Sequence, residues 1–142
     1  VGGVHRHTPE MVQNLSKVAG ERVTVSFTPI LAPMSRGILA TCSSPIRPGV
    51  TAQQAYDAYA SAYAGEPFVH LLPPGLWPQT QSVAGSNAVH LQVTVDEAAG
   101  RLVAVGAVDN LTKGTAGAAV QCLNLALGLP EATGLTTVGL AP

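Results

Sequence analysis

Residues 89–108 carry the pattern that most constrains how this chain folds. Val89, Leu91, Val93 and Val95 alternate with polar residues, and this period of two predicts a half-buried strand. The segment 102–108 is apolar throughout, which is typical of a strand covered on both faces. Residues 96–100 join the two strands as a five-residue hairpin connection. We therefore expect a sheet with an antiparallel hairpin that other elements cover.

Weaker patterns predict three more strands. Apolar and polar residues alternate at 22–28, which predicts a strand there. Two prolines then hold an extended segment before a strand at 36–43, and a short strand is predicted at 68–72. Together with the hairpin these make roughly five strands, which we expect to form a mixed, largely antiparallel sheet.

Helices are predicted at 8–19, 52–64 and 115–127. The first has Thr8 as its expected N-cap and Pro9 at its first position, and the second follows Thr51 as N-cap. The sequence thus predicts an α+β fold in which two helices cover one face of the sheet and a third lies near the end of the chain.

The composition limits the classes of function. The 142 residues are 46% hydrophobic and only 11% charged, with a net charge of −1. This balance excludes intrinsic disorder and gives no electrostatic footprint for nucleic acid or an anionic membrane. No stretch approaches the ~20 uninterrupted apolar residues of a membrane-spanning helix. A surface so poor in charge indicates that part of it is covered in the assembled protein.

Two features bear on the origin of the chain. It opens with Val1-Gly2-Gly3, without an initiator methionine or a signal-peptide pattern, so we expect a piece of a longer protein or a processed product. Cys42 and Cys122 are 80 positions apart in apolar surroundings, and we expect them to be buried, reduced thiols. This cysteine usage favours a cytoplasmic location.

The densest chemical cluster is His5-Arg6-His7, just before the first helix. On extended backbone His5 and His7 project from one face and offer two ligands to zinc, but further ligands are missing because the other two histidines are isolated in strand patterns. Alternatively, the dipole and free N–H groups of the helix keep His7 neutral, as a general base requires. In a third interpretation both histidines are exposed polar residues. The residues alone leave all three open.

A catalytic site at this cluster would lack a nucleophile. Arg6 or Arg36 could supply a guanidinium fork for a carboxylate or a phosphate. Neither Cys42 nor Cys122 lies near a glycine turn, a helix N-terminus or a basic cluster, so neither has the surroundings of an activated thiolate.

A second candidate site is the segment 109–117, DNLTKGTAG, between a strand and a helix. Glycines at such a turn resemble phosphate cradles, yet neither the Walker nor the Rossmann spacing is present. The structural alternative is that Gly114 and Gly117 permit a tight turn and close packing.

An ordered set of motifs runs through nearly the whole chain. They are GG at 2–3, HRHTPE at 5–10, FTP at 27–29, PM at 33–34, RGI at 36–38, PFV at 67–69, GSN at 85–87, VDNL at 108–111, KG at 113–114, AVQ at 119–121 and GLPE at 128–131. Each is modest alone, but in this order they resemble the carboxy-terminal domain of the N-acetyl-gamma-glutamyl-phosphate reductases, a family of NADPH-dependent enzymes of arginine biosynthesis.

The resemblance implies a two-domain enzyme of the glyceraldehyde-phosphate and aspartate-semialdehyde dehydrogenase type. An amino-terminal Rossmann domain would bind NADP(H) and carry a nucleophilic cysteine, which attacks the acyl phosphate before hydride transfer yields the semialdehyde. Residues 1–109 would be the catalytic and dimerisation α+β domain, with a mixed sheet and helices on one face. Residues 110–142 would form a helix and tail that pack on the absent nucleotide-binding domain. The chain alone would be inactive, and the enzyme a cytoplasmic homo-oligomer.

The resemblance also implies roles for individual residues. His7 would be the acid/base, with His5, Arg6 and Arg36 contacting the small acyl-phosphate substrate. Asn110 would lie near the nicotinamide carboxamide, with Lys113, Gly114 and Gly117 beside it, and no metal is implied. One departure is Ile30, where the family usually has histidine, and neither cysteine matches the nucleophile. Two alternatives remain: a relative resembling aspartate-semialdehyde dehydrogenase, and a non-catalytic oligomerisation module.

Overall fold

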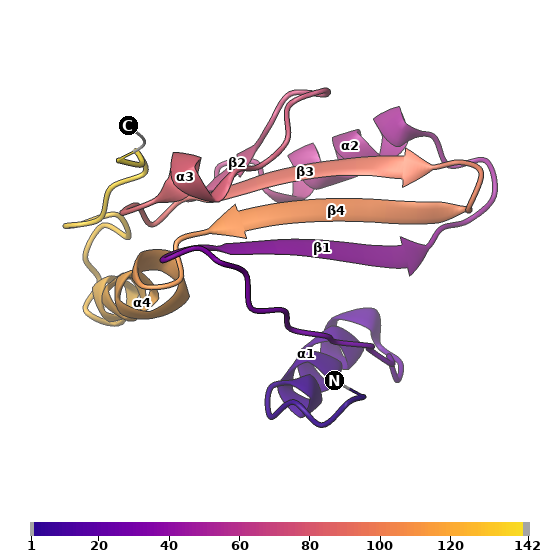
Figure 1. The fold of residues 1–142 in the computed structure, drawn as a ribbon. Helices are drawn as coiled ribbons and strands as arrows, with labels where there is room; N and C mark the ends of the chain where they lie inside the picture. The colour runs from indigo at the N-terminus through magenta and orange to yellow at the C-terminus, as the bar shows by residue number, and fades with distance from the viewer. Residues whose placement is uncertain (1, 141–142) are drawn as a thin grey trace. The chain divides into compact units, whose positions relative to one another are not determined.

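A four-stranded mixed sheet is the centre of the larger part of the chain (Figure 1). The structure is a computed structural model that describes residues 2–140. In the sheet order β1-β4-β3-β2, β4 pairs antiparallel with both β1 and β3, and β2 runs parallel to β3. The predicted α+β class and mixed, largely antiparallel sheet are confirmed. The strands are β1 (Ile38–Pro45), β2 (Val69–Leu71), β3 (Val89–Asp96) and β4 (Arg101–Val108).

The chain divides into two units, residues 1–34 and residues 35–142. The first contains helix α1 (Thr8–Ala19), as predicted. The second contains the sheet, helices α2 (Ala52–Ala62), α3 (Thr80–Val83) and α4 (Gly117–Ala126), and a π-helical turn η1 (Thr112–Ala116). No helix among residues 2–140 is long and apolar enough to cross a membrane.

The hairpin of β3 and β4 follows the sequence pattern closely. Asp96 pairs with Arg101, so the connection between the paired residues is four residues long rather than five. The Asp96 Oδ1 atom accepts a hydrogen bond of 3.0 Å from the Ala99 N–H, and Gly100 supplies a positive φ of 62° at the end of the turn.

The two faces of the sheet are covered differently. On one face Ala55 of α2 packs against Val93 and Ala104, with tyrosines of the same helix around them. On the other face Ala107 packs against Val83 of α3, because residues three apart in β4 point to opposite sides. The predicted covering of β4 on both sides is therefore confirmed. The one-turn α3 was not predicted, and it lies on the face opposite α2.

The expected bounds of α1 match the structure, and α2 begins where expected but ends at Ala62, two residues before the expected end. Thr51 accepts a hydrogen bond from the Gln54 N–H, and the Gln54 side chain accepts one from the Thr51 N–H, which completes a capping box. In α1 the N-cap is His7 and not Thr8, whose hydroxyl lies buried inside the first turn without a hydrogen-bond partner. Pro9 occupies the first turn as expected.

The predicted strand at 22–28 is wrong. The segment is irregular, and the Val23 N–H donates to the Ser16 Oγ atom of α1 at 2.9 Å instead of to a neighbouring strand. Alternating residues form a strand only where a neighbouring strand offers backbone hydrogen bonds. The described residues of the first unit contain no strand that could pair with 22–28. The described residues therefore form four strands and not five.

Candidate functional site

The two histidines of the first cluster lie together at the start of α1. The His5 Nδ1 atom accepts a hydrogen bond of 3.3 Å from the His7 N–H. The His5 ring stands edge-on to the rings of both His7 and Phe27, with centroids 5.0 Å away in each case. Phe27 thus holds His5 from the segment that was predicted as a strand, a contact that the alternation could not reveal.

Asp109 is the central acceptor of the second unit. Its Oδ1 atom accepts hydrogen bonds from the N–H groups of Leu111 and Thr112, both at 2.8 Å. Its Oδ2 atom accepts from the Gly85 N–H at 2.5 Å and pairs with the Arg36 Nε atom at 2.6 Å. The carboxylate has no exposed surface. It therefore ties the ends of three segments to the end of β4.

The charge of Asp109 is strongly stabilised where it lies. Burial alone raises the pKa of this carboxyl group, but the backbone N–H groups of Thr112 and Gly85, the Arg36 guanidinium and the Leu111 N–H outweigh it and lower the pKa well below 3.8. The carboxyl group is ionised at neutral pH in consequence. The Arg36 side chain remains 41% exposed, and its Nη2 atom also donates to the Thr112 Oγ1 atom at 3.0 Å.

Asn110 is held in one orientation by the backbone before β1. Its Oδ1 atom accepts a hydrogen bond of 2.7 Å from the Gly37 N–H. Gly37 has a φ of 104°, and a Cβ atom there would lie 2.8 Å from the Thr80 Cβ atom, so both the conformation and the space require glycine. No hydrogen bond among residues 2–140 engages the Asn110 Nδ2 group. Asn110 is thus arranged as a donor.

The segment after Asn110 turns as a π-helix before α4 begins. The Gly114 N–H donates to the Asp109 carbonyl at 2.8 Å and the Ala116 N–H to the Leu111 carbonyl at 3.0 Å, both five residues back. The Lys113 Nζ atom donates to the Gln121 Oε1 atom at 2.6 Å and lies 5.3 Å from the centroid of the buried Phe68 ring. The single predicted helix at 115–127 is therefore a π-turn followed by α4.

Gly117 allows the closest approach in this region. A Cβ atom there would collide with the Asn87 Oδ1 atom and the Thr112 carbonyl. Asn87 is fully buried, and its Nδ2 group donates to the Gln121 Oε1 atom at 3.0 Å, while its Oδ1 atom has no partner. Gln121 in turn donates to the Glu131 carboxylate at 2.5 Å. This polar cluster joins α4 to the tail.

The structure brings five of the predicted site residues into one connected region of the second unit. They are Arg36, Asn110, Lys113, Gly114 and Gly117, whereas His5, Arg6 and His7 belong to the first unit. Three further residues of this region fall within the motifs, but the sequence predicted no role for them: Asp109, Asn87 and Gln121. A single acid directly after a wholly apolar strand was the available signal for Asp109, because such a carboxylate needs partners if it is buried.

Cys42 and Cys122 are free thiols as predicted, but both are exposed and not buried. No group of three or more metal-ligating side chains occurs within residues 2–140. His70 and His90, which look isolated in the sequence, stand opposite each other on β2 and β3.

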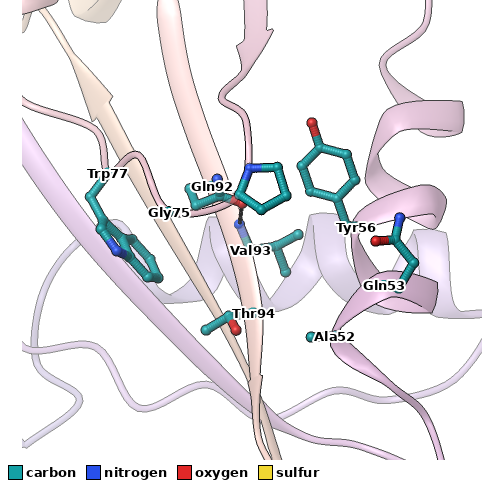
Figure 2. Close-up of a pocket in the computed structure, with 9 residues that line it drawn as sticks. Ala52, Gln53, Tyr56, Gly75, Trp77, Gln92, Val93 and Thr94 are labelled. Atoms are coloured by element: carbon teal, nitrogen blue, oxygen red, sulfur yellow. Dashed lines mark hydrogen bonds between the residues drawn. The ribbon is translucent and has the colours of Figure 1, made fainter.

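A small cavity lies at the edge of β3, away from the predicted site residues. Figure 2 shows Tyr56 and Gln53 of α2 on one side of β3 and Trp77 on the other, with Thr94 on the strand itself. Its volume is about 120 Å³. Ligand pockets usually measure roughly 300–1,000 Å³, so this cavity does not fit a dinucleotide.

Comparison with known proteins assigns the chain to a family. Residues 1–110 match the family described as semialdehyde dehydrogenase, dimerisation domain. The chain is 70% identical over its whole length to the N-acetyl-gamma-glutamyl-phosphate reductase of Saccharopolyspora erythraea, 69% identical to that of Streptomyces coelicolor and 66% identical to that of Streptomyces avermitilis. It covers 42% of each of these relatives. The chain therefore belongs to the semialdehyde dehydrogenase dimerisation-domain family.

Proposed function

We propose that this chain is the carboxy-terminal part of an NADPH-dependent reductase that converts N-acetyl-gamma-glutamyl phosphate to N-acetylglutamate semialdehyde with release of phosphate. The observation that carries the proposal is the 70% identity, over all 142 residues, to a protein of that name. The match covers the whole chain, so it includes the histidine cluster, the Asp109 network and α4.

In this proposal His7 moves the protons. It takes the proton from a cysteine thiol of the amino-terminal domain and returns one to the hydroxyl group that forms on the substrate carbon. His5, whose Nδ1 atom accepts from the His7 N–H and whose ring stands edge-on to the His7 ring, positions it and contacts substrate. Arg6 and Arg36 bind the anionic groups of the substrate. Arg36 uses Nε and Nη2 within the protein, which leaves Nη1 for a ligand.

NADPH would supply the hydride, held mainly by the amino-terminal domain. Within this chain the fit is confined to one end of the cofactor. The Asn110 Nδ2 group is a donor with no partner among residues 2–140, which suits a carboxamide oxygen. Lys113 is engaged by Gln121, so it supports the Asn110 loop more than it offers a free cation to phosphate. Gly114 and Gly117 shape that loop.

The exposed side of α4 supports a covering domain. Leu123 and Leu127, which lie on one side of α4 and at its C-cap, are 55% and 64% exposed. Leu125, on another side of the helix, is 58% exposed, so α4 carries exposed apolar side chains in more than one direction. We propose that residues 110–142 pack there on the nucleotide-binding domain and that residues 1–109 form the catalytic and dimerisation part. The family match, which ends at residue 110, agrees with this division.

We further propose a homo-oligomer assembled through the β1 side of the sheet, in the cytoplasm. Every residue of β1 is exposed, including Ile38 and Leu39 at 47% and 53%. An exposed apolar edge strand is a site where another chain adds or packs. The description of the family as a dimerisation domain supports the same assignment.

The test uses the full-length protein that contains this chain. NADP⁺ reduction is followed with N-acetylglutamate semialdehyde and phosphate as substrates, in the wild type, His7→Ala and the control His70→Ala. Loss of a general base lowers turnover by roughly 10²–10⁴-fold, so His7→Ala is expected to lose at least that lower factor and His70→Ala to retain normal turnover. Near-normal turnover of His7→Ala would overturn its assignment as the base.

Two alternatives separate in the same assay. A relative resembling aspartate-semialdehyde dehydrogenase would turn over aspartate semialdehyde faster than N-acetylglutamate semialdehyde. A non-catalytic oligomerisation module would turn over neither substrate in the full-length protein.

A further inference from the structure

His70 and His90 form an adjacent pair on the sheet. They are directly opposite in the parallel register of β2 and β3, so their Cβ atoms lie on one face about one strand spacing of ~4.8 Å apart. Their ring centroids are 5.6 Å apart and the ring planes are inclined by only 23°. Neither histidine belongs to the histidine cluster of the first unit or to the Asp109 network.

The ring nitrogens of the pair are unused by the protein. Within residues 2–140 neither imidazole donates or accepts a hydrogen bond, although both rings are half-buried. Partial burial, and then the neighbouring His70, lower the pKa of His90 below 6.5. The lowered pKa favours the neutral His90 imidazole, which is the form that coordinates a metal ion.

We propose that His70 and His90 form a two-histidine site for a divalent transition-metal ion of the zinc and nickel class. Each imidazole nitrogen lies ~2.0–2.1 Å from such an ion, so two rings on one tetrahedral ion have centroids roughly 5 Å apart. The observed 5.6 Å is close to that spacing. Rotation about the soft χ2 torsions turns one nitrogen of each ring toward a common ion.

The surroundings favour this class of ion over hard cations. The neighbouring cavity of about 460 Å³ is lined by His90 with Gln79, Ser82 and apolar side chains, and it contains no carboxylate. Imidazole suits zinc, copper and nickel, whereas magnesium and calcium need oxygen ligands. With two protein ligands, the remaining positions go to water from the cavity, so the ion exchanges readily and is not a structural metal.

The experiment titrates the chain, with any flanking sequence that its gene supplies, with Zn²⁺ or Ni²⁺ at neutral pH. Histidine-resolved NMR of the wild type locates the ion, and calorimetry gives its affinity. The imidazole signals of His70 and His90 are expected to shift or broaden together. His70→Gln and His90→Gln are each expected to weaken binding by roughly tenfold or more. The readout is independent of enzymatic activity.

The matched control removes the competing histidine pair. The ring centroids of His5 and His7 also lie 5.0 Å apart, so this pair could bind the ion as well. The titration is therefore repeated in a His5→Gln/His7→Gln variant, and retained binding there supports the proposal. Signals that shift only at His5 and His7, or affinity that is unchanged in both His70→Gln and His90→Gln, would overturn it. The wild-type NMR measurement decides the question even where a variant does not fold.

Discussion

Replacing Asp109 by alanine removes the acceptor for three backbone N–H groups and one guanidinium at once. A buried donor without a partner costs about 1–3 kcal/mol, and breaking a buried ion pair costs about 3–5 kcal/mol. Arg36 is 41% exposed and regains water, so its share is small, whereas the fully buried site gives water little access to the backbone groups. The expected loss in free energy of unfolding is therefore about 3 kcal/mol, one lower-bound penalty for each N–H group.

Urea unfolding followed by circular dichroism measures this loss, with two matched variants. Asp109→Asn keeps an oxygen for Leu111 and Thr112 but presents an NH₂ group to Gly85 and Arg36, so it should lose less than alanine. Arg36→Gln removes only the exposed partner and should lose about 1 kcal/mol or less. If Asp109→Ala loses less than about 1 kcal/mol, Asp109 is not the acceptor that holds these segments together.

The wild type and Asp109→Asn should also differ in how their stability depends on pH. Because folding lowers the pKa of Asp109, its contribution to stability is present above the ordinary value of 3.8 and is lost as the pH falls toward and through the lowered value. Below pH 3.8 the wild type should therefore lose stability more steeply than Asp109→Asn. Parallel stability curves for the two proteins would contradict the assignment of a stabilised carboxylate.

Three further predictions concern other parts of the second unit. Because the pKa of His90 is lowered on folding, its contribution to stability is present above pH 6.5 and is lost as the pH falls from there. The urea midpoint of His90→Gln should therefore change less with pH below 6.5 than that of the wild type. The same pH dependence in both proteins counts against this prediction. Gly117→Ala should lose about 1–3 kcal/mol in urea unfolding through overpacking against Asn87, although its φ of −66° suits alanine; a gain in stability would show that Asn87 yields. Phe68→Ala should lose about 3–5 kcal/mol in the same assay because its ring is 2% exposed, and a loss near that of a surface residue would refute its central packing.

Local signals predicted most of the fold. The hairpin, the capping box at Thr51 and the helix at Pro9 each depend on neighbours within a few residues, so the sequence carries them directly. The segment 22–28 failed because a strand depends on a partner that pattern alone cannot supply. The helix at 115–127 was found, but its π-helical start depends on the position of Asp109 after β4.

The candidate site was proposed from the order of the motifs more than from the chemistry of the residues. Arg36 and Asp109 are 73 positions apart, and only the pairing of β1 with β4 brings them together. The same holds for His70 and His90, which face each other because β2 and β3 share a register. Residue types and short spacings therefore named candidates, whereas the contacts that orient them required the strand order.

The Gln92 side chain occupies backbone hydrogen-bonding groups at the β2 side of the sheet. Odd-numbered residues of β3 bond toward β2, as the Val89 N–H and the Leu91 carbonyl show. Beyond the end of β2, the next N–H group on this side, that of Val93, donates to the Gln92 Oε1 atom at 2.8 Å. The Gln92 Nε2 group donates to the carbonyls of Leu72 and Pro73. The Gln92 side chain thus satisfies a backbone N–H group of β3 that a longer β2 would otherwise bind, and so it leaves fewer free backbone groups at this edge. The opposite margin of the sheet is the exposed strand β1.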